Sequence, residues 1–463
     1  MTPSPTTDTD IAALLRQAGL LERGGAEWLD ATPQPIDAYE RDSAAFARFW
    51  QLGDALLDKL PAKEAAASAV IAACRSARDR FLAAHVERVY RAITNDLKAF
   101  IRVEHLVREA ARAVPGLVPA PELLAAENVR AHKDKHGIEI DHGIFLNHAL
   151  AHPIAGAHLC HAMLLPRPEA LDRLDELRSR GAIELATATV ERSGRAAIVT
   201  LRNPRFLNAE DETTLEDSEI AIDLATLDPL SEVAVLRGGV VEHPKYAGRR
   251  LFSAGINLTH LYRGQIPFVW YLQRDLGLVN KIFRGLARAD ESPDELSGGT
   301  IEKPWIAAVD GFAIGGGCQI LLAIDYVIAA SDAYLTLPAR KEGIIPGAAN
   351  LRLPRFVGDR IARQAILYGR RLDCASAEGR LICDEVAAPD AMDTAVEQAI
   401  AGLSDSGVVS AAGNRRALRV GQEPLDLFRR YMAVYAREQA YCHFSPALIA
   451  NLERYWNAAQ RRV

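Results

Sequence analysis

The chain contains 463 residues, of which 49% are hydrophobic and 25% are charged, and its formal net charge is −6. This length is enough for roughly two to four folded units, and the ordinary proportions of apolar and charged residues exclude a wholly disordered chain. Because the net charge is small and negative, the composition argues against a dedicated nucleic-acid-binding protein.

Membrane and secretory segments are not expected either. The most apolar stretch, residues 301–329, is interrupted by Glu302, Lys303 and Asp325, so we expect no membrane span and no membrane partner. The first ten residues, MTPSPTTDTD, lack the basic start and the apolar run of a secretory signal. The six cysteines are scattered without a CxxC pair, which is typical of reduced thiols. We therefore expect a cytoplasmic protein.

Residues 11 to about 180 show a helical pattern almost throughout. Apolar residues recur at helical spacing, with charged residues between them, at Val70, Cys74, Ala77, Phe81, Val89 and Ile93. Prolines at positions 61, 115, 119 and 121 divide the segment into separate helices. We predict a helical N-terminal domain that spans residues 1–183.

From about Gly181 the pattern changes to short strands that alternate with helices. A helix is expected over residues 210–227, and strands are expected over residues 183–190, 196–201, 233–236, 306–309, 326–330 and 334–337. This alternation indicates an α/β core over residues 184–390. After about Pro389 the chain is helical again, most clearly over 425–440 and 446–460. Residues 391–463 are therefore expected to form a C-terminal helical region.

Three consecutive glycines, Gly315, Gly316 and Gly317, follow a buried strand and precede a helical run over residues 319–324. Glycines let the backbone approach a ligand closely and leave the first amides of the helix unobstructed. Those amides lie at the positive end of the helix dipole, where they favour an anion or a developing oxyanion. Taken alone, the glycine run fits a tight strand–helix packing turn equally well.

A second turn of this kind lies about sixty residues earlier. In residues 251–258, an expected strand is followed by Ala254 and Gly255 and then by the start of an expected helix. Two such turns in one domain can direct two backbone N–H groups at a single carbonyl oxygen, which is the geometry of an oxyanion hole.

Together with residues 203–209, 343–348 and 375–386, and in the same order along the chain, these turns resemble the crotonase (enoyl-CoA hydratase/isomerase) superfamily. The resemblance implies an α/β crotonase-like core of ββα units that binds an acyl-CoA. It implies that the amides of Ile256 and Gly316, or of Gly317 in another register, hold the thioester oxygen. It places the contacts to coenzyme A and substrate at Arg205, Asn208, His243, Lys245, Tyr246, Ala254, Gly255, Asn257, Leu258, Gly315 and Gly317. For the loop at 243–246, a plain surface role is at least as compatible with the sequence.

Two departures from the family exclude hydration of a double bond. Family hydratases use two glutamates, and this chain has Gln319 and Ala339 at the matching positions. Hydration needs one carboxylate to activate water and a second group to deliver a proton, and neither glutamine nor alanine can do this. Glu342 lies three residues from the second position, so we expect its side chain to point elsewhere.

The long helical segment before the core resembles the cofactor-independent dioxygenases of this superfamily. That resemblance implies conversion of 3,5-dihydroxyphenylacetyl-CoA and O2, through a stabilised enolate, to 3,5-dihydroxyphenylglyoxylate and free coenzyme A, in the supply of a glycopeptide antibiotic precursor. It also implies that no metal or redox cofactor takes part. A homo-oligomer, either a trimer or a hexamer, is implied as well, assembled partly through the C-terminal helices. Such a reaction needs enolate stabilisation, a dry pocket and polar partners for two phenols.

Three side chains are candidates for binding the phenols. Glu210 stands where the family has an apolar residue, Arg274 belongs to a helical run that covers the acyl pocket in this family, and Gln319 follows the glycine run. Each has an ordinary alternative. For Glu210 the alternative is a surface acid at a helix start, and for Arg274 it is a solvated helix charge, which fits equally well. For Gln319 it is a buried amide that satisfies backbone groups, which is the less favoured interpretation.

Two further alternatives concern metals and function. Seven of the twelve histidines fall within thirty residues, at His132, His136, His142, His148, His152, His158 and His161. Two pairs have the i, i+4 spacing of helical metal ligands, but no carboxylate motif accompanies them, so packing is favoured over a metal site. The other candidate functions are a crotonase-type thioesterase or isomerase of an aryl-CoA, and a non-catalytic acyl-CoA-binding scaffold.

Overall fold

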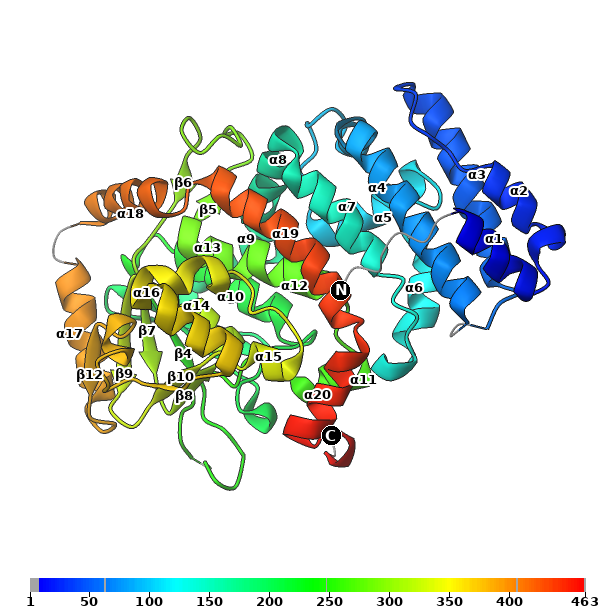
Figure 1. The fold of residues 1–463 in the computed structure, drawn as a ribbon. Helices are drawn as coiled ribbons and strands as arrows, with labels where there is room; N and C mark the ends of the chain where they lie inside the picture. The colour runs from blue at the N-terminus through cyan, green and yellow to red at the C-terminus, as the bar shows by residue number, and fades with distance from the viewer. Residues whose placement is uncertain (1–7, 62–63, 247, 405–406, 462–463) are drawn as a thin grey trace.

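The structure, a computed structural model, describes residues 8–61, 64–246, 248–404 and 407–461. Figure 1 shows a bundle of N-terminal helices beside a core in which helices surround a sheet, with further helices at the C-terminus. This is the fold class expected from the sequence. The domain boundaries at residues 183 and 390 stay predictions.

Helices alone form the N-terminal part. They are α1 (Asp8–Gln17), α2 (Gly25–Asp30), α3 (Tyr39–Leu57), α4 (Ala65–Ile93), α5 (Val103–Ala113), α6 (Pro121–Asn128), α7 (Ile140–Ala151), α8 (Pro153–Leu164) and α9 (Pro168–Arg180). Pro121, Pro153 and Pro168 occupy the first turn of α6, α8 and α9, where a missing N–H breaks no helical hydrogen bond. Buried aromatic rings fill the contact between α3 and α4, where the rings of Phe46 and Phe81 lie 5.3 Å apart.

The core contains a seven-stranded sheet in the order β1-β2-β3-β4-β7-β9-β12. Its strands are β1 (Ala182–Glu184), β2 (Ala188–Ser193), β3 (Ala196–Leu201), β4 (Val233–Gly238), β7 (Trp305–Val309), β9 (Tyr326–Ala330) and β12 (Glu385–Ala387). The first three are antiparallel and the others continue in parallel. Strand β7 is buried along its whole length, as expected for a central strand covered on both faces. A smaller sheet contains β8 (Phe312–Ile314), β10 (Tyr334–Thr336) and β11 (Leu372–Asp373).

Two of the elements predicted from the sequence differ in part from those in the structure. The expected strand over 183–190 is split into β1 and β2, because a turn reverses the chain and pairs Ala182 with Glu191. The expected helix over 210–227 begins only at Leu215, as α10 (Leu215–Leu227). Acidic residues at 210–212 favour a helix start locally, but Glu210 forms an extended bridge with Ile256. That tertiary pairing fixes the backbone in a non-helical conformation.

The C-terminal region consists of α17 (Met392–Ser404), α18 (Val408–Gln422), α19 (Leu425–His443) and α20 (Pro446–Trp456). Helix α19 runs back across the molecule and lies along α7 of the N-terminal part (Figure 1). The Asn147 side-chain amide donates to the Ala433 carbonyl at 2.7 Å. A Cβ built on Gly143 would lie 2.4 Å from the Cβ of Ala440, so the two helices are in close backbone contact.

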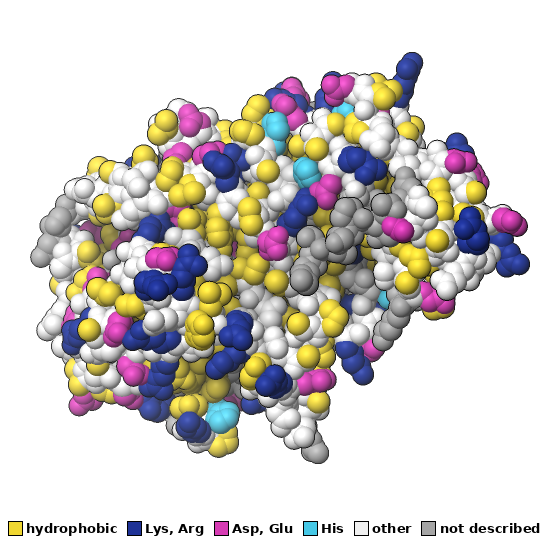
Figure 2. Space-filling view, in the orientation of Figure 1, with side chains coloured by type: hydrophobic (Ala, Val, Ile, Leu, Met, Phe, Trp, Pro, Cys, Tyr) yellow, Lys and Arg dark blue, Asp and Glu magenta, His cyan; other side chains and the backbone are white. Residues whose placement is uncertain are grey.

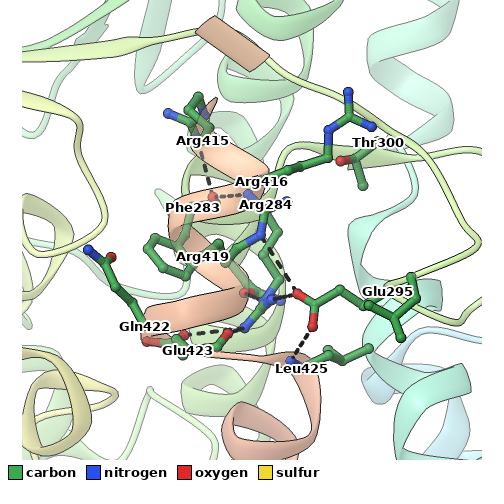
Figure 3. Close-up of polar contacts among 12 residues, drawn as sticks. Phe283, Arg284, Glu295, Thr300, Arg415, Arg416, Arg419, Gln422, Glu423 and Leu425 are labelled. Carbon is green, nitrogen blue, oxygen red and sulfur yellow. Dashed lines mark hydrogen bonds and ion pairs between the residues drawn. The ribbon is translucent and has the colours of Figure 1, made fainter. Parts of the chain in front are cut away.

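Buried charges anchor the junction between α18 and α19 on the core (Figure 3). Arg284 donates to the Glu295 carboxylate and to the Glu423 carbonyl, each at 2.6 Å. Glu295 also accepts from the Leu425 amide at 2.6 Å. The Glu423 side chain is fully buried and accepts from Arg352 at 2.8 and 2.9 Å. The start of α19 is thereby held at a fixed place on the core.

The surface agrees with the small net charge. Figure 2 shows basic and acidic side chains interspersed over the face that it presents. None of the helices in the described part of the chain is both long enough and apolar enough to cross a membrane.

Candidate active site

The two glycine turns of the core meet side by side. The Ile314 amide donates to the Ser253 carbonyl at 3.0 Å, and the Ser253 amide donates to the Phe312 carbonyl at 3.3 Å. Gly255 has a φ of +78°, and a Cβ built on it would lie 2.6 Å from the Ile314 carbonyl oxygen and 3.0 Å from the Gly316 nitrogen. Only glycine fits this contact, because the position combines a left-handed backbone with a close approach.

Two amides remain free where the turns meet. Within the described ranges, the N–H groups of Ile256 and Gly316 donate no hydrogen bond, and both residues line one cavity. Gly316 is the first residue of α14 (Gly316–Leu321), so its amide has no partner within the helix. Gly317 does not line the cavity, and a Cβ built on it would meet the Ser253 Cβ at 2.8 Å. The arrangement suits a carbonyl oxygen that takes on negative charge.

The three side chains expected to bind the phenols lie together, with Glu210 and Gln319 both in contact with Arg274. This arginine begins η4 (Arg274–Val279), a π-helix between α12 (Val269–Gln273) and α13 (Asn280–Arg284), and is 3% exposed. Its guanidinium donates to Glu210 at 2.9 and 3.1 Å, to Gln319 at 2.9 Å and to the Gly316 carbonyl at 2.8 Å. Arg274 is therefore not a solvated charge, and Glu210 does not start a helix.

The charge of Arg274 is balanced within the cavity wall. Besides Glu210, it binds Asp275 at 2.9 Å. Burial alone would lower the pKa of Arg274, but these two carboxylates outweigh it and raise the pKa, so the guanidinium stays charged. Burial raises the pKa of Asp275.

The side chain of Glu342 does not lie where the sequence predicts. We expected this side chain to point away from the site, but it is 8% exposed and lines the same cavity as the two amides. It ends the short helix α15 (Ala339–Glu342), which starts at the position of the missing second glutamate. Residues three apart on a helix share a face, so this spacing was the signal available in the sequence.

The residues expected to contact coenzyme A fall into two groups. Asn208 and Asn257 are buried and bind their own chain. The Asn208 side chain donates to the carbonyls of Gly239 and Leu251 at 2.8 Å, and Asn257 donates to Asp211 at 2.8 Å and caps α11 (Leu258–Arg263). The hydrogen bonds of their side chains therefore support the turn that carries Ile256, and a contact of either residue to coenzyme A stays a prediction.

The other group of expected coenzyme A residues lies nearer the surface. Arg205 is exposed in η3 (Pro204–Phe206). In the loop at 243–246, the Lys245 ammonium lies 5.0 Å from the centre of the Tyr246 ring, which packs edge-on against Phe312. Arg205 and Lys245 are both exposed to solvent.

Six of the seven clustered histidines have separate partners, whereas neither ring nitrogen of the buried His142 has a hydrogen-bond partner among the described residues. Neither i, i+4 pair shares one helix, since His132 lies in η2 (His132–Asp134) and His136 lies beyond it, while His148 is in α7 and His152 caps α8. Among the described residues, the group able to offer three ligand atoms within 4.8 Å is Asp211, Glu212 and His260. None of the seven belongs to it.

Comparisons with known proteins identify the family of the chain. The enoyl-CoA hydratase/isomerase family model matches residues 191–419. The (3,5-dihydroxyphenyl)acetyl-CoA 1,2-dioxygenase of Amycolatopsis orientalis is 48% identical over 407 residues, which cover 86% of this chain and 92% of that protein. The short-chain-enoyl-CoA hydratase of Clostridium acetobutylicum is 33% identical over 218 residues, or 46% of this chain and 74% of that protein. A crystal structure of an enoyl-CoA hydratase from Mycobacterium avium subsp. paratuberculosis K-10 aligns with a TM-score of 0.48 and 24% identity, covering 58% of this chain and 98% of that one. The chain thus belongs to the enoyl-CoA hydratase/isomerase (crotonase) family.

Proposed function

We propose that this protein is a dioxygenase that acts on (3,5-dihydroxyphenyl)acetyl-CoA. The observation that carries the proposal is the 48% identity with the A. orientalis enzyme of that name, which extends over 92% of its length. That match includes the N-terminal helices as well as the core. The site supports the proposal, because Gln319 and Ala339 replace the two carboxylates that a hydratase needs.

In the proposed reaction, the thioester oxygen accepts hydrogen bonds from the amides of Ile256 and Gly316. Loss of a Cα proton gives an enolate that these amides stabilise. The enolate passes an electron to O2, and recombination forms a Cα–O bond. The resulting peroxide attacks the thioester carbon and releases the coenzyme A thiolate. Cleavage of the O–O bond with loss of the second Cα proton gives the 2-oxo acid, so all atoms of substrate and O2 are found in the products.

We assign recognition of the ring hydroxyls to Arg274 with Glu210 and Gln319. The three side chains form one hydrogen-bonded group beside Gly316, which would place the ring next to the enolate. The cavity leaves about 20 Å³ for a water-sized sphere, room for about one water molecule. We therefore expect an aryl group to enter only when side chains in the cavity wall move.

The Glu210→Gln variant tests this assignment. It keeps the shape of the side chain but removes its charge, so a charge-assisted hydrogen bond of about 1.5–3 kcal/mol is weakened. We expect kcat/KM for the dihydroxylated substrate to fall roughly tenfold or more, and kcat/KM for phenylacetyl-CoA to fall much less. Comparing both substrates in both proteins gives the coupling between carboxylate and hydroxyl. Equal losses would mean that Glu210 supports Arg274 or the fold and does not bind the ring.

An oxygen electrode tests the function itself. Purified protein with the arylacetyl-CoA is expected to consume one O2 for each coenzyme A released, and to release none under anaerobic conditions. Release of coenzyme A without O2 would favour a thioesterase. Binding of the thioester without turnover would favour the acyl-CoA-binding scaffold.

We also propose that the reaction needs no metal or redox cofactor, since an enolate can reduce O2 directly. Protein treated with a chelator and then freed of it is expected to keep its full rate of O2 uptake. Loss of activity that Fe(II) or another metal restores would contradict this. The group formed by Asp211, Glu212 and His260 would then be the first place to look for the ion.

Assembly and location are the remaining proposals. Family membership supports a homo-oligomer, either a trimer or a hexamer, which native mass spectrometry would distinguish from a monomer. A cytoplasmic location and a role in antibiotic biosynthesis stay predictions from the sequence.

A further inference from the structure

Three carboxylates line the cavity of the candidate site, and one cation, Arg274, pairs with two of them. Arg274 donates to Glu210 at 2.9 and 3.1 Å and to Asp275 at 2.9 Å. Arg274 thus occupies oxygen atoms of both carboxylates, so Glu210 and Asp275 are already engaged in hydrogen bonds within the cavity wall.

The third carboxylate, that of Glu342, has different surroundings. Within the part of the chain that the structure describes, it has neither an ion pair nor a hydrogen bond. It shares the cavity wall with the apolar side chains of Trp270, Ile344 and Ile345. Burial raises the pKa of Glu342 to about 7. A side chain with these properties exchanges protons readily near neutral pH.

Glu342 lines, from the end of α15, the same cavity as the two free amides. Ala339 and Glu342 begin and end this helix, lie on one face of it and both line the cavity. Ala339 matches the second glutamate of the hydratases, so a carboxylate lost at one position is replaced one helical turn later. The free amides of Ile256 and Gly316 open into the same cavity. A thioester held by those amides would present its Cα here.

We propose that Glu342 is the general base that removes the Cα proton of the thioester. The inference rests on the proposed function. In this step the proton moves from Cα to a carboxylate oxygen of Glu342. The electron pair of the C–H bond stays on the substrate as the enolate, which the two amides stabilise. The step consumes no oxidant, so it proceeds without O2.

Exchange of the Cα hydrogens with solvent deuterium under anaerobic conditions is the test. The protein is incubated in D2O with (3,5-dihydroxyphenyl)acetyl-CoA, and deuterium in the substrate is followed by mass spectrometry. We expect exchange in Glu342→Gln to be at least about 100-fold slower than in the wild type, with an equal loss of O2 uptake. Glu342→Asp keeps a carboxylate on a shorter side chain and is expected to retain part of the exchange. Exchange at the wild-type rate in Glu342→Gln would overturn the proposal.

Lys341→Gln is the matched control, since Lys341 is the exposed neighbour of Glu342 on α15. It is expected to exchange at the wild-type rate. Glu342→Gln itself should bind the thioester with an affinity within about threefold of the wild type. Because it removes a buried charge, it should raise Tm at pH 8 and leave Tm nearly unchanged at pH 5, where the wild-type carboxyl is already protonated. Loss of thioester binding in this variant would assign Glu342 a structural role and refute the proposal.

The pH dependence of exchange gives an independent readout. A base must be deprotonated, so the wild-type rate should rise with pH and level off above about pH 7. The other titratable groups on the cavity wall are Glu210, Tyr271, Arg274, Asp275 and Tyr435. Burial raises the pKa of both tyrosines, so they stay protonated over this range. The midpoint should shift in Glu342→Asp, and an unchanged midpoint would mean that another of these groups titrates.

Failure of the inference and failure of the proposed function are separable. If the wild-type protein exchanges the Cα hydrogens but consumes no O2, the role of Glu342 as the base is supported and the proposed dioxygenase function is refuted. If the wild-type protein consumes O2 and the Glu342→Gln variant turns over at the full rate, the dioxygenase function is supported and the role of Glu342 as the base is refuted.

Discussion

Replacing Gly255 with alanine is expected to lower kcat/KM by about 100-fold or more. The added Cβ would lie 2.6 Å from the Ile314 carbonyl oxygen and 3.0 Å from the Gly316 nitrogen. The two turns must then separate, and the amides of Ile256 and Gly316 can no longer reach one oxygen. Loss of a single oxyanion-hole donor typically costs about 10²–10³ in rate. Steady-state kinetics with the arylacetyl-CoA, at fixed O2, gives the ratio.

Gly194→Ala is the control for backbone strain. Gly194 also has a positive φ, of +56°, but a Cβ built on it meets no atom within 4 Å. Both variants should therefore lose stability from the left-handed backbone, while only Gly255→Ala should lose activity. A similar fall of kcat/KM in both variants would show that the loss reflects stability and not the oxyanion hole.

Glu423→Gln is expected to cause the largest loss of stability, about 3–5 kcal/mol in the free energy of unfolding. The fully buried carboxylate of Glu423 faces Arg284, Arg352 and Arg355. Burial alone would raise the pKa of Glu423, but these arginines outweigh it and lower the pKa to about 2. Glutamine leaves three arginines without their shared counter-charge. Urea unfolding at pH 7 measures the difference.

The effect of Glu423→Gln should depend on pH in a defined direction. A carboxylate with a lowered pKa adds stability above about pH 4.5, and this stability is lost as the pH falls towards 2. The gap between wild type and variant should therefore narrow at acidic pH. Asp359→Asn, which breaks an exposed ion pair with Arg363, is the control and should change stability little at any pH. A constant gap from pH 7 to pH 3 would contradict the assignment to charge.

The parts of the site that depend on local sequence could be predicted. A glycine run between a strand and a helix specifies its own geometry, and the two turns at 253–256 and 315–317 lie where their residues indicated. The strands and helices around them follow from apolar periodicity in the same way.

The parts that depend on distant residues could not be predicted. Glu210 looked like a helix start because acids favour that position, but pairing with Ile256 keeps it extended. The direction of the Glu342 side chain was predicted wrongly, because only the residue at the matching family position was considered able to reach the site. On a helix, a residue one turn away reaches the same cavity. The hydrogen bonds around Arg274 join three segments of the chain, namely the one at Glu210, η4 and α14, and no local pattern shows this.

The contact between α7 and α19 has a consequence for synthesis of the chain. The hydrogen bond from Asn147 to Ala433 joins residues 286 positions apart. At about 5–20 residues per second, the ribosome adds that length in roughly 15–60 seconds. During this interval the face of α7 that α19 covers has no partner from its own chain, and the N-terminal helices cannot complete their packing. A helix made near the end of synthesis is thus needed by helices made much earlier. A chain interrupted before residue 425 would carry an intact pair of glycine turns beside an uncovered helical bundle.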